Sequence, residues 1–162
     1  GTQGAVGELR RKLHASRDTD WGGPVVNGGN CLGIRSVPGR TNSLFLPEWK
    51  APFPAGDASP VAVLSQSGAF LAAKSSALSD LNPRFMVSIG NQIDLTIPDY
   101  LEHLADDPEL HVFACYVEGF RPGDGLRFVE LAGRIVASGG MELAEQVETE
   151  GVEAWQTAAA AS

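Results

Sequence analysis

A short run of small polar residues stands directly after a continuously apolar segment. Residues 61–64 are all apolar, and the next four are Ser65, Gln66, Ser67 and Gly68. Residues 69–78 are rich in alanine, so this stretch predicts a strand, a tight turn and a helix. Such a turn directs unpaired backbone N–H groups and the positive end of a helix dipole toward one point. It could bind a phosphate or carboxylate group; a capped helix without a ligand is the alternative.

The start and the buried face of that helix can also be predicted. Either Ser65 or Ser67 would cap the first turn, and Gly68 would let the backbone approach a ligand closely. Helical periodicity places four side chains on one apolar face: Phe70, Ala73, Ala77 and Leu78.

Three further segments with strand character end in polar or glycine-containing turns. Residues 84–89 precede Gly90, Asn91 and Gln92, and residues 112–117 precede Glu118 and Gly119. A shorter candidate strand over 24–27 leads into the glycine-rich run 28–33, which contains Asn30. Because these segments have strand-like apolar runs and turn residues at their ends, we expect four strands in residues 24–117.

Helical segments separate most of these strands. Besides 69–78, a helix is expected over 97–104, beginning at Asp94 or Thr96, and another from 124 or 125 to 137. The resulting order, β-β-α-β-α-β-α, predicts an α/β domain with a parallel sheet and right-handed crossovers. Ligands in such sheets bind beyond the carboxyl ends of the strands, so the four polar turns should share one rim.

The remaining segments define the expected domain limits. Residues 1–23 form an N-terminal segment, a linker or a short helix over 6–15, and residues 24–140 form the domain. Within it, 35–59 is proline-rich and is expected to be an irregular excursion. Residues 141–162 are an acidic and then alanine-rich tail.

Composition excludes several classes of function. The chain has 162 residues and a formal net charge of −8 without any basic run, which argues against nucleic-acid binding. No segment approaches the about 20 apolar residues of a membrane helix, and no signal-peptide pattern is present. Cys31 and Cys115 form neither a disulfide framework nor a metal motif. Two buried free thiols predict a cytoplasmic location, and no metal site is expected.

Taken together, these turns resemble the CoA-ligase domain of the NDP-forming acyl-CoA synthetases, the superfamily of succinyl-CoA synthetase and ADP-forming acetyl-CoA synthetase. The family pattern Gly-Pro-Asn-Cys-Leu-Gly corresponds to residues 28–33, and Ser-Gln-Ser-Gly-Ala to 65–69. Ser-x-Gly-Asn-x-x-Asp corresponds to 88–94, the Asp-Tyr-Leu…Asp-Asp-Pro block to 99–108, and Tyr-x-Glu-Gly to 116–119. The resemblance implies a flavodoxin-like three-layer fold with a parallel sheet.

The resemblance also implies a reaction and roles for named residues. Members join a carboxylic acid to CoA with ATP or GTP through an acyl phosphate, with ADP or GDP as the nucleotide product, and a histidine carries the phosphoryl group between sites. Ser65–Gly68 would hold the phosphoryl or acyl-phosphate group, and Glu118 would orient the carrier histidine. Asn30 and Asn91 would line the same pocket. No cofactor is expected to bind tightly, since CoA and the nucleotide are substrates of the complete enzyme.

The chain also departs from the family pattern. No histidine follows His111, so the carrier histidine loop has no counterpart, and Gly29 replaces the usual proline. Neither the CoA-binding Rossmann domain nor the ATP-grasp domain is present. The resemblance therefore implies that both are partners, on the same gene or another chain, and that the isolated piece is inactive and could self-associate.

Two functions from different classes follow. In the first, the chain is the phosphoryl-binding domain of an acid–CoA ligase. In the second, it is a non-catalytic interaction domain that kept the fold and lost the carrier histidine. A flavin-binding flavodoxin relative is disfavoured, because the Ser/Thr-rich phosphate loop expected near an N-terminal strand is missing.

Overall fold

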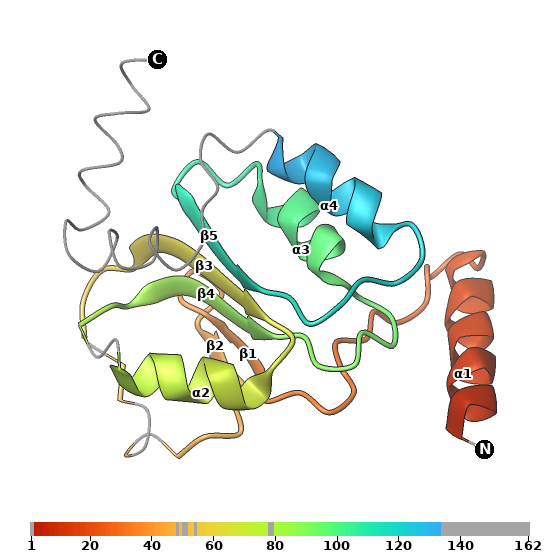
Figure 1. The fold of residues 1–162 in the computed structure, drawn as a ribbon, viewed down its shortest axis with the longest axis horizontal. Coiled ribbons are helices and arrows are strands. Elements are labelled where there is room, and N and C mark those ends of the chain that lie inside the picture. The colour runs from red at the N-terminus through yellow and green to blue at the C-terminus, as the bar shows by residue number, and fades with distance from the viewer. Residues whose placement is uncertain (1, 48, 50–51, 54, 78–79, 134–162) are drawn as a thin grey trace.

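A computed structural model of the chain describes residues 2–47, 49, 52–53, 55–77 and 80–133. A five-stranded sheet is the middle layer, with α2 on one face and α3 and α4 on the other (Figure 1). The strands are β1 (Gly33–Ser36), β2 (Thr41–Asn42), β3 (Ser59–Ser65), β4 (Pro83–Ser88) and β5 (Val112–Tyr116). The helices are α1 (Thr2–Arg17), α2 (Gly68–Ala77), α3 (Ile97–Leu104) and α4 (Asp124–Ala132). The expected flavodoxin-like three-layer architecture is confirmed.

The expected parallel pairing is found among β3, β4 and β5, and an antiparallel pair of strands beside β4 makes the whole sheet mixed. The strand order is β2-β1-β4-β3-β5; β3 pairs in parallel with β4 and β5, while β1 pairs antiparallel with both β4 and β2. The three parallel strands are those joined by helical crossovers. The β1–β2 pair is a hairpin, which needs only a short turn, and antiparallel pairing is what such a turn permits.

The candidate strand over 24–27 was a wrong prediction. This segment is extended without being a strand, and its bonds to the loop after β4 include one from the Leu95 N–H to the Val26 carbonyl at 3.1 Å. Val25 is 66% exposed and Val26 is half-buried, so neither valine is enclosed as a central strand residue would be. The sheet position beside β4 is taken by β1 instead. The expected irregular excursion over 35–59 therefore contains the end of β1, all of β2 and the start of β3.

Alternate residues of the parallel strands build two cores. Ala62, Leu64 and Val87 face α3 and α4, whereas Val63 and Met86 face α2. In α2 the buried side chain is Leu71; Ala73 and Ala77 are exposed, so the predicted apolar face was wrong. Leu78 lies outside the described residues. An alanine-rich helix has few large side chains, so its one leucine decides which face packs.

The helix starts on the other face follow the local sequence. The Asp99 carboxylate accepts hydrogen bonds from the Thr96 N–H and hydroxyl, both at 2.9 Å, so α3 begins after Thr96 rather than Asp94. Asp124 begins α4, as one of its two predicted starts, and the predicted end at 137 lies outside the described residues. Within the described part of the chain, none of the helices has the length and hydropathy that a membrane crossing requires.

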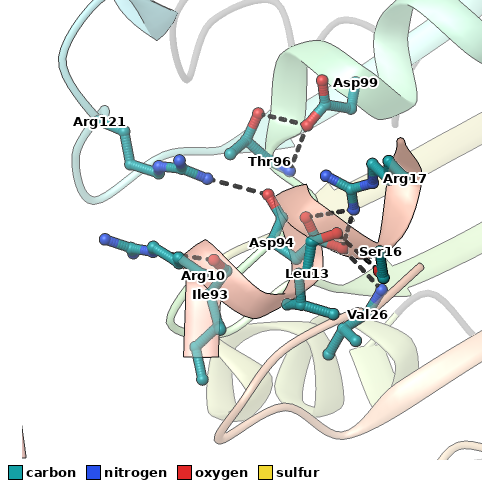
Figure 2. A network of polar contacts seen from close by, with 10 residues as sticks. All are labelled: Arg10, Leu13, Ser16, Arg17, Val26, Ile93, Asp94, Thr96, Asp99 and Arg121. Atoms are coloured by element: carbon teal, nitrogen blue, oxygen red, sulfur yellow. Dashed lines mark hydrogen bonds and ion pairs between the residues drawn. The ribbon is translucent and has the colours of Figure 1, made fainter. Parts of the chain in front are cut away.

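Helix α1 stands at the side of the domain and is attached by arginines (Figures 1 and 2). Arg10 donates to the carbonyls of Ile93 and Gln92, at 2.9 and 3.2 Å. From the other side, Arg121 donates to the Asp94 carbonyl at 2.9 Å. The loop between β4 and α3 is therefore held by side chains from two distant parts of the sequence.

Candidate functional site

The carboxyl ends of the three parallel strands meet at one rim. The Gln66 N–H bonds the Tyr116 carbonyl at 3.1 Å, and the Ile89 N–H bonds the Ser65 carbonyl at 2.7 Å. These bonds continue the sheet ladders past the last strand residues. The turns after β3, β4 and β5 are thereby side by side, as the sequence predicted.

The rim also contains the switch point of the sheet. After β3 the chain turns to the α2 face, and after the neighbouring β5 it turns to the face that α3 and α4 cover (Figure 1). Two adjacent strands whose connections leave in opposite directions open a crevice between their ends, where open α/β sheets bind ligands. Ser65–Gly68 follow β3 and Glu118 follows β5, so they lie on the two sides of this switch point.

The turn after β3 is closed by its two serines. Ser67 caps α2, because its Oγ accepts the Phe70 N–H at 3.2 Å and its carbonyl accepts the Leu71 N–H at 3.1 Å. Ser65 is fully buried and donates to the Ser67 carbonyl at 2.7 Å, so it shapes the turn and does not cap the helix. The N–H groups of Gly68 and Ala69 belong to the first helical turn, where no intrahelical acceptor exists. These two donors are suited to an anion.

Gly68 is required by close packing. A Cβ at this position would lie 2.8 Å from Leu32 Cγ and 3.5 Å from Ser88 Oγ. The Ser88 hydroxyl in turn accepts the Leu32 N–H at 2.9 Å. The loop before β1 is therefore seated on the start of α2.

That same loop brings the two asparagines near each other. The Asn91 N–H bonds the Gly29 carbonyl at 2.8 Å, and a Cβ at Gly90 would collide with the carbonyls of Gly29 and Asn30. Both asparagine side chains are exposed, and no hydrogen bond joins either to another described residue. The structure thus places Asn30 and Asn91 on adjoining loops of the rim, as free amides.

Glu118 is exposed, and its carboxylate makes no hydrogen bond or ion pair to any described residue. Its peptide, by contrast, is firmly held. The Gln66 side chain accepts the Glu118 and Gly119 N–H groups at 2.5 and 2.9 Å and donates to the Gly119 carbonyl at 2.6 Å. Gln92, which sequence reasoning did not single out, donates to the same carbonyl at 3.3 Å. The sequence signal that could have identified Gln92 is its position in the polar turn after β4.

Two hollows lie away from the turn after β3. One of about 340 Å³ is lined by residues that include His14, Asp94 and Arg121, and one of about 450 Å³ by residues that include His103 and Tyr100. Neither is lined by Ser65–Gly68 or Glu118. His111 precedes β5, at the opposite end of that strand from Glu118. Among the described residues, no cluster of three or more potential ligands is placed to hold a metal ion.

These features define a flavodoxin-like α/β domain with an open, polar rim at its switch point. Comparison with known proteins then identifies its family. Residues 58–140 match the family model of the succinyl-CoA ligase like flavodoxin domain, and the chain belongs to that family.

The relatives and solved structures that it resembles are ligases of much greater length. It is 35% identical over 115 residues to an acetate–CoA ligase [ADP-forming] II subunit alpha of Pyrococcus furiosus, covering 70% of this chain and 23% of the relative. It is 36% identical over 122 residues to a trans-feruloyl-CoA synthase of an unknown prokaryotic organism, covering 72% and 16%.

An acetyl-coenzyme A synthetase 1 of Ca. Korarchaeum cryptofilum, solved with phosphate and ADP, superimposes with a TM-score of 0.69 at 31% identity, over 83% of this chain and 27% of that one. The chain thus spans about a quarter or less of the proteins it matches and resembles part of an ADP-forming acyl-CoA ligase.

Proposed function

We propose that this chain is the phosphoryl-handling domain of an NDP-forming acid–CoA ligase and needs partner domains for turnover. One observation carries the proposal: the Ser67-capped start of α2, with first-turn N–H groups at Gly68 and Ala69, lies across the switch point from Glu118. Backbone donors at a helix N-terminus stabilise a phosphoryl or acyl-phosphate group without a metal. The phosphate and ADP in the archaeal synthetase structure support this assignment.

The roles of the other rim residues follow from their chemistry. Glu118 carries a carboxylate that could accept the ring N–H of a carrier histidine, which fixes the tautomer and stabilises the imidazolium. Asn30 and Asn91 supply exposed amide donors on the adjoining loops. The histidine, the CoA-binding Rossmann domain and the ATP-grasp domain would come from partner segments, and CoA and an ATP- or GDP-type nucleotide would be substrates of the complete enzyme.

An amide NMR titration of the 162-residue chain with inorganic phosphate and acetyl phosphate tests this function. We expect saturable shifts at Ser67, Gly68 and Ala69 and little response to CoA. Gly125 is the matched control, since it lies in the first turn of α4, another helix that starts near the rim. Equal shifts at both helix starts would indicate unspecific anion binding and would contradict the proposal.

The second candidate function is a non-catalytic interaction domain. It is favoured by exposed apolar side chains: Phe45, Leu126 and Val129 are 88%, 76% and 67% exposed. Light scattering at rising concentration measures self-association. Self-association of a chain whose rim amides do not shift with phosphate would favour the interaction domain. Saturable phosphate shifts would favour the ligase domain.

A further inference from the structure

One side chain of the turn is directed away from the candidate anion position. Gln66 is 6% exposed, and its amide is occupied by the Glu118–Gly119 peptide. Its oxygen accepts two N–H groups and its nitrogen donates to a carbonyl, so both ends of the amide are used. Because two backbone donors face the oxygen, the orientation of this amide is fixed without ambiguity.

These bonds make the Gln66 side chain an extension of the sheet. The main chain of Gln66 already bonds the Tyr116 carbonyl at 3.1 Å, the last backbone rung between the ends of β3 and β5. The side chain then makes three further bonds to the next peptides of the β5 exit, where the backbones have diverged. The Gln66 amide is buried and satisfied at both ends, and losing it would remove the side-chain partner of the Glu118 N–H and of the Gly119 N–H and carbonyl.

The Gly119 carbonyl is held from one further direction. Gln92 donates to the Gly119 carbonyl at 3.3 Å, and its oxygen accepts the Ile97 N–H at 3.4 Å. These bonds are longer than those of Gln66, so Gln66 is the main support. The carboxylate of Glu118 itself has no described contact, and its position depends on its backbone.

We propose that Gln66 is a positioning residue that fixes the Glu118–Gly119 peptide, and so aims the Glu118 carboxylate, and that its side chain does not bind the phosphoryl group. This inference rests on the proposed function, in which Glu118 orients the carrier histidine. It divides the turn into two parts. Ser67, Gly68 and Ala69 would supply the anion donors, whereas Gln66 would connect that site to the carboxylate on the neighbouring strand.

Two substitutions in the 162-residue chain test, by amide hydrogen exchange, whether Gln66 holds the backbone of Glu118 and Gly119. Gln66→Met keeps the length of the side chain and removes all three bonds, so exchange at Glu118 and Gly119 should accelerate about tenfold or more. The Ile89 N–H, bonded to Ser65, is the internal reference for general loosening. Gln66→Glu retains the oxygen that accepts both N–H groups but loses the donor to the Gly119 carbonyl, so it should restore protection only in part. Gln92→Met, the matched control, should change exchange less than Gln66→Met does.

A spectroscopic signature separates positioning from general stability. The Glu118 N–H donates to the Gln66 side chain, and its proton resonance should move upfield in Gln66→Met, which lacks that acceptor. A chain destabilised elsewhere, by Val87→Ala in the core, should keep that resonance. If Gln66→Met does not fold, the same comparison is made between Gln66→Glu and the unsubstituted chain.

The phosphate titration tests whether the Gln66 side chain binds the phosphoryl group. We expect Gln66→Met to bind inorganic phosphate within about threefold of the unsubstituted chain. A loss of phosphate binding of tenfold or more, with exchange at Glu118 and Gly119 unchanged, would make Gln66 a ligand and overturn the inference. If the unsubstituted chain binds no phosphate, the proposed function fails, whereas exchange at Glu118 and Gly119 still decides whether Gln66 holds this peptide.

Discussion

Arg17 and Asp94, which are 77 residues apart, are joined by an ion pair in which one guanidinium nitrogen contacts both carboxylate oxygens, at 2.6 and 2.5 Å. The Asp94 carboxylate also accepts the Val26 N–H at 2.9 Å, as Figure 2 shows. One buried side chain therefore connects α1, the segment before β1 and the loop that contains Asn91 and Gln92.

The ion pair between Arg17 and Asp94 should make the free energy of unfolding fall at acid pH. Burial by itself raises the pKa of Asp94, but the hydrogen bonds from Arg17 and the Val26 N–H outweigh it and hold the pKa below its ordinary value. The unfolded carboxyl titrates near pH ~4, so the stabilisation is complete above that pH and is lost as pH falls through the lower folded pKa. Asp94→Asn should lower the free energy of unfolding at neutral pH by about 2 kcal/mol.

Urea unfolding between neutral pH and about pH 2 measures this effect. The acid slope should flatten in Asp94→Asn but not in Asp106→Asn, whose exposed carboxyl makes no hydrogen bond or ion pair to a described residue. Some slope should remain in both, because Arg84 holds the pKa of Asp107 below its ordinary value against the effect of burial. Equal slopes in the two variants would show that Asp94 is not the main acid-sensitive group.

Removal of the α2 cap is a second test. Ser67→Ala deletes the acceptor of the Phe70 N–H and should cost about 1 kcal/mol of unfolding free energy. It should also weaken phosphate binding, since the first turn becomes less ordered. Ser75→Ala, in the same helix, removes only a bond to the Leu71 carbonyl and should be neutral or slightly stabilising. Equal losses in both variants would argue against a capping role.

Two helical glycines should respond in opposite ways to alanine. At Gly125 a Cβ would meet Phe120 at ordinary contact distances of 3.6 Å or more, so Gly125→Ala should stabilise by about 0.5–1 kcal/mol. At Gly68 a Cβ would lie 2.8 Å from Leu32 Cγ, and Gly68→Ala should destabilise by about 1–3 kcal/mol. Thermal unfolding of both variants gives the signs. Stabilisation by Gly68→Ala would mean that Leu32 can move aside at no cost.

Much of the domain could be predicted from sequence because local signals agreed with packing. The apolar run before Ser65 became β3, and Thr96 with Pro98 began α3 where a cap and an early proline indicate a helix start. The shared rim followed from a general rule for α/β sheets, which needs only the order of the elements.

The features that could not be predicted from the sequence depend on contacts between distant residues. Nothing local to Gly33–Ser36 shows that this segment takes the sheet position beside β4, because pairing is decided by the partner strand. Gln66 stands in a turn that looks like an anion site, yet its amide is taken up by a peptide 52 and 53 residues away. A side chain's hydrogen-bond partner across the sheet is not encoded in its neighbours.

The remaining prediction concerns the reactivity of Cys115. This thiol lies on β5 and packs against the core shared with α3 and α4, and burial raises its pKa to about 12. Because only the thiolate reacts, alkylation of Cys115 in the native chain at pH ~8 should be about 100-fold slower, or more, than in the unfolded chain. Cys31→Ser leaves Cys115 as the sole thiol, so its rate can be followed directly with a maleimide. A native rate within tenfold of the unfolded one would show that β5 opens readily or that the thiol is less enclosed than the fold indicates.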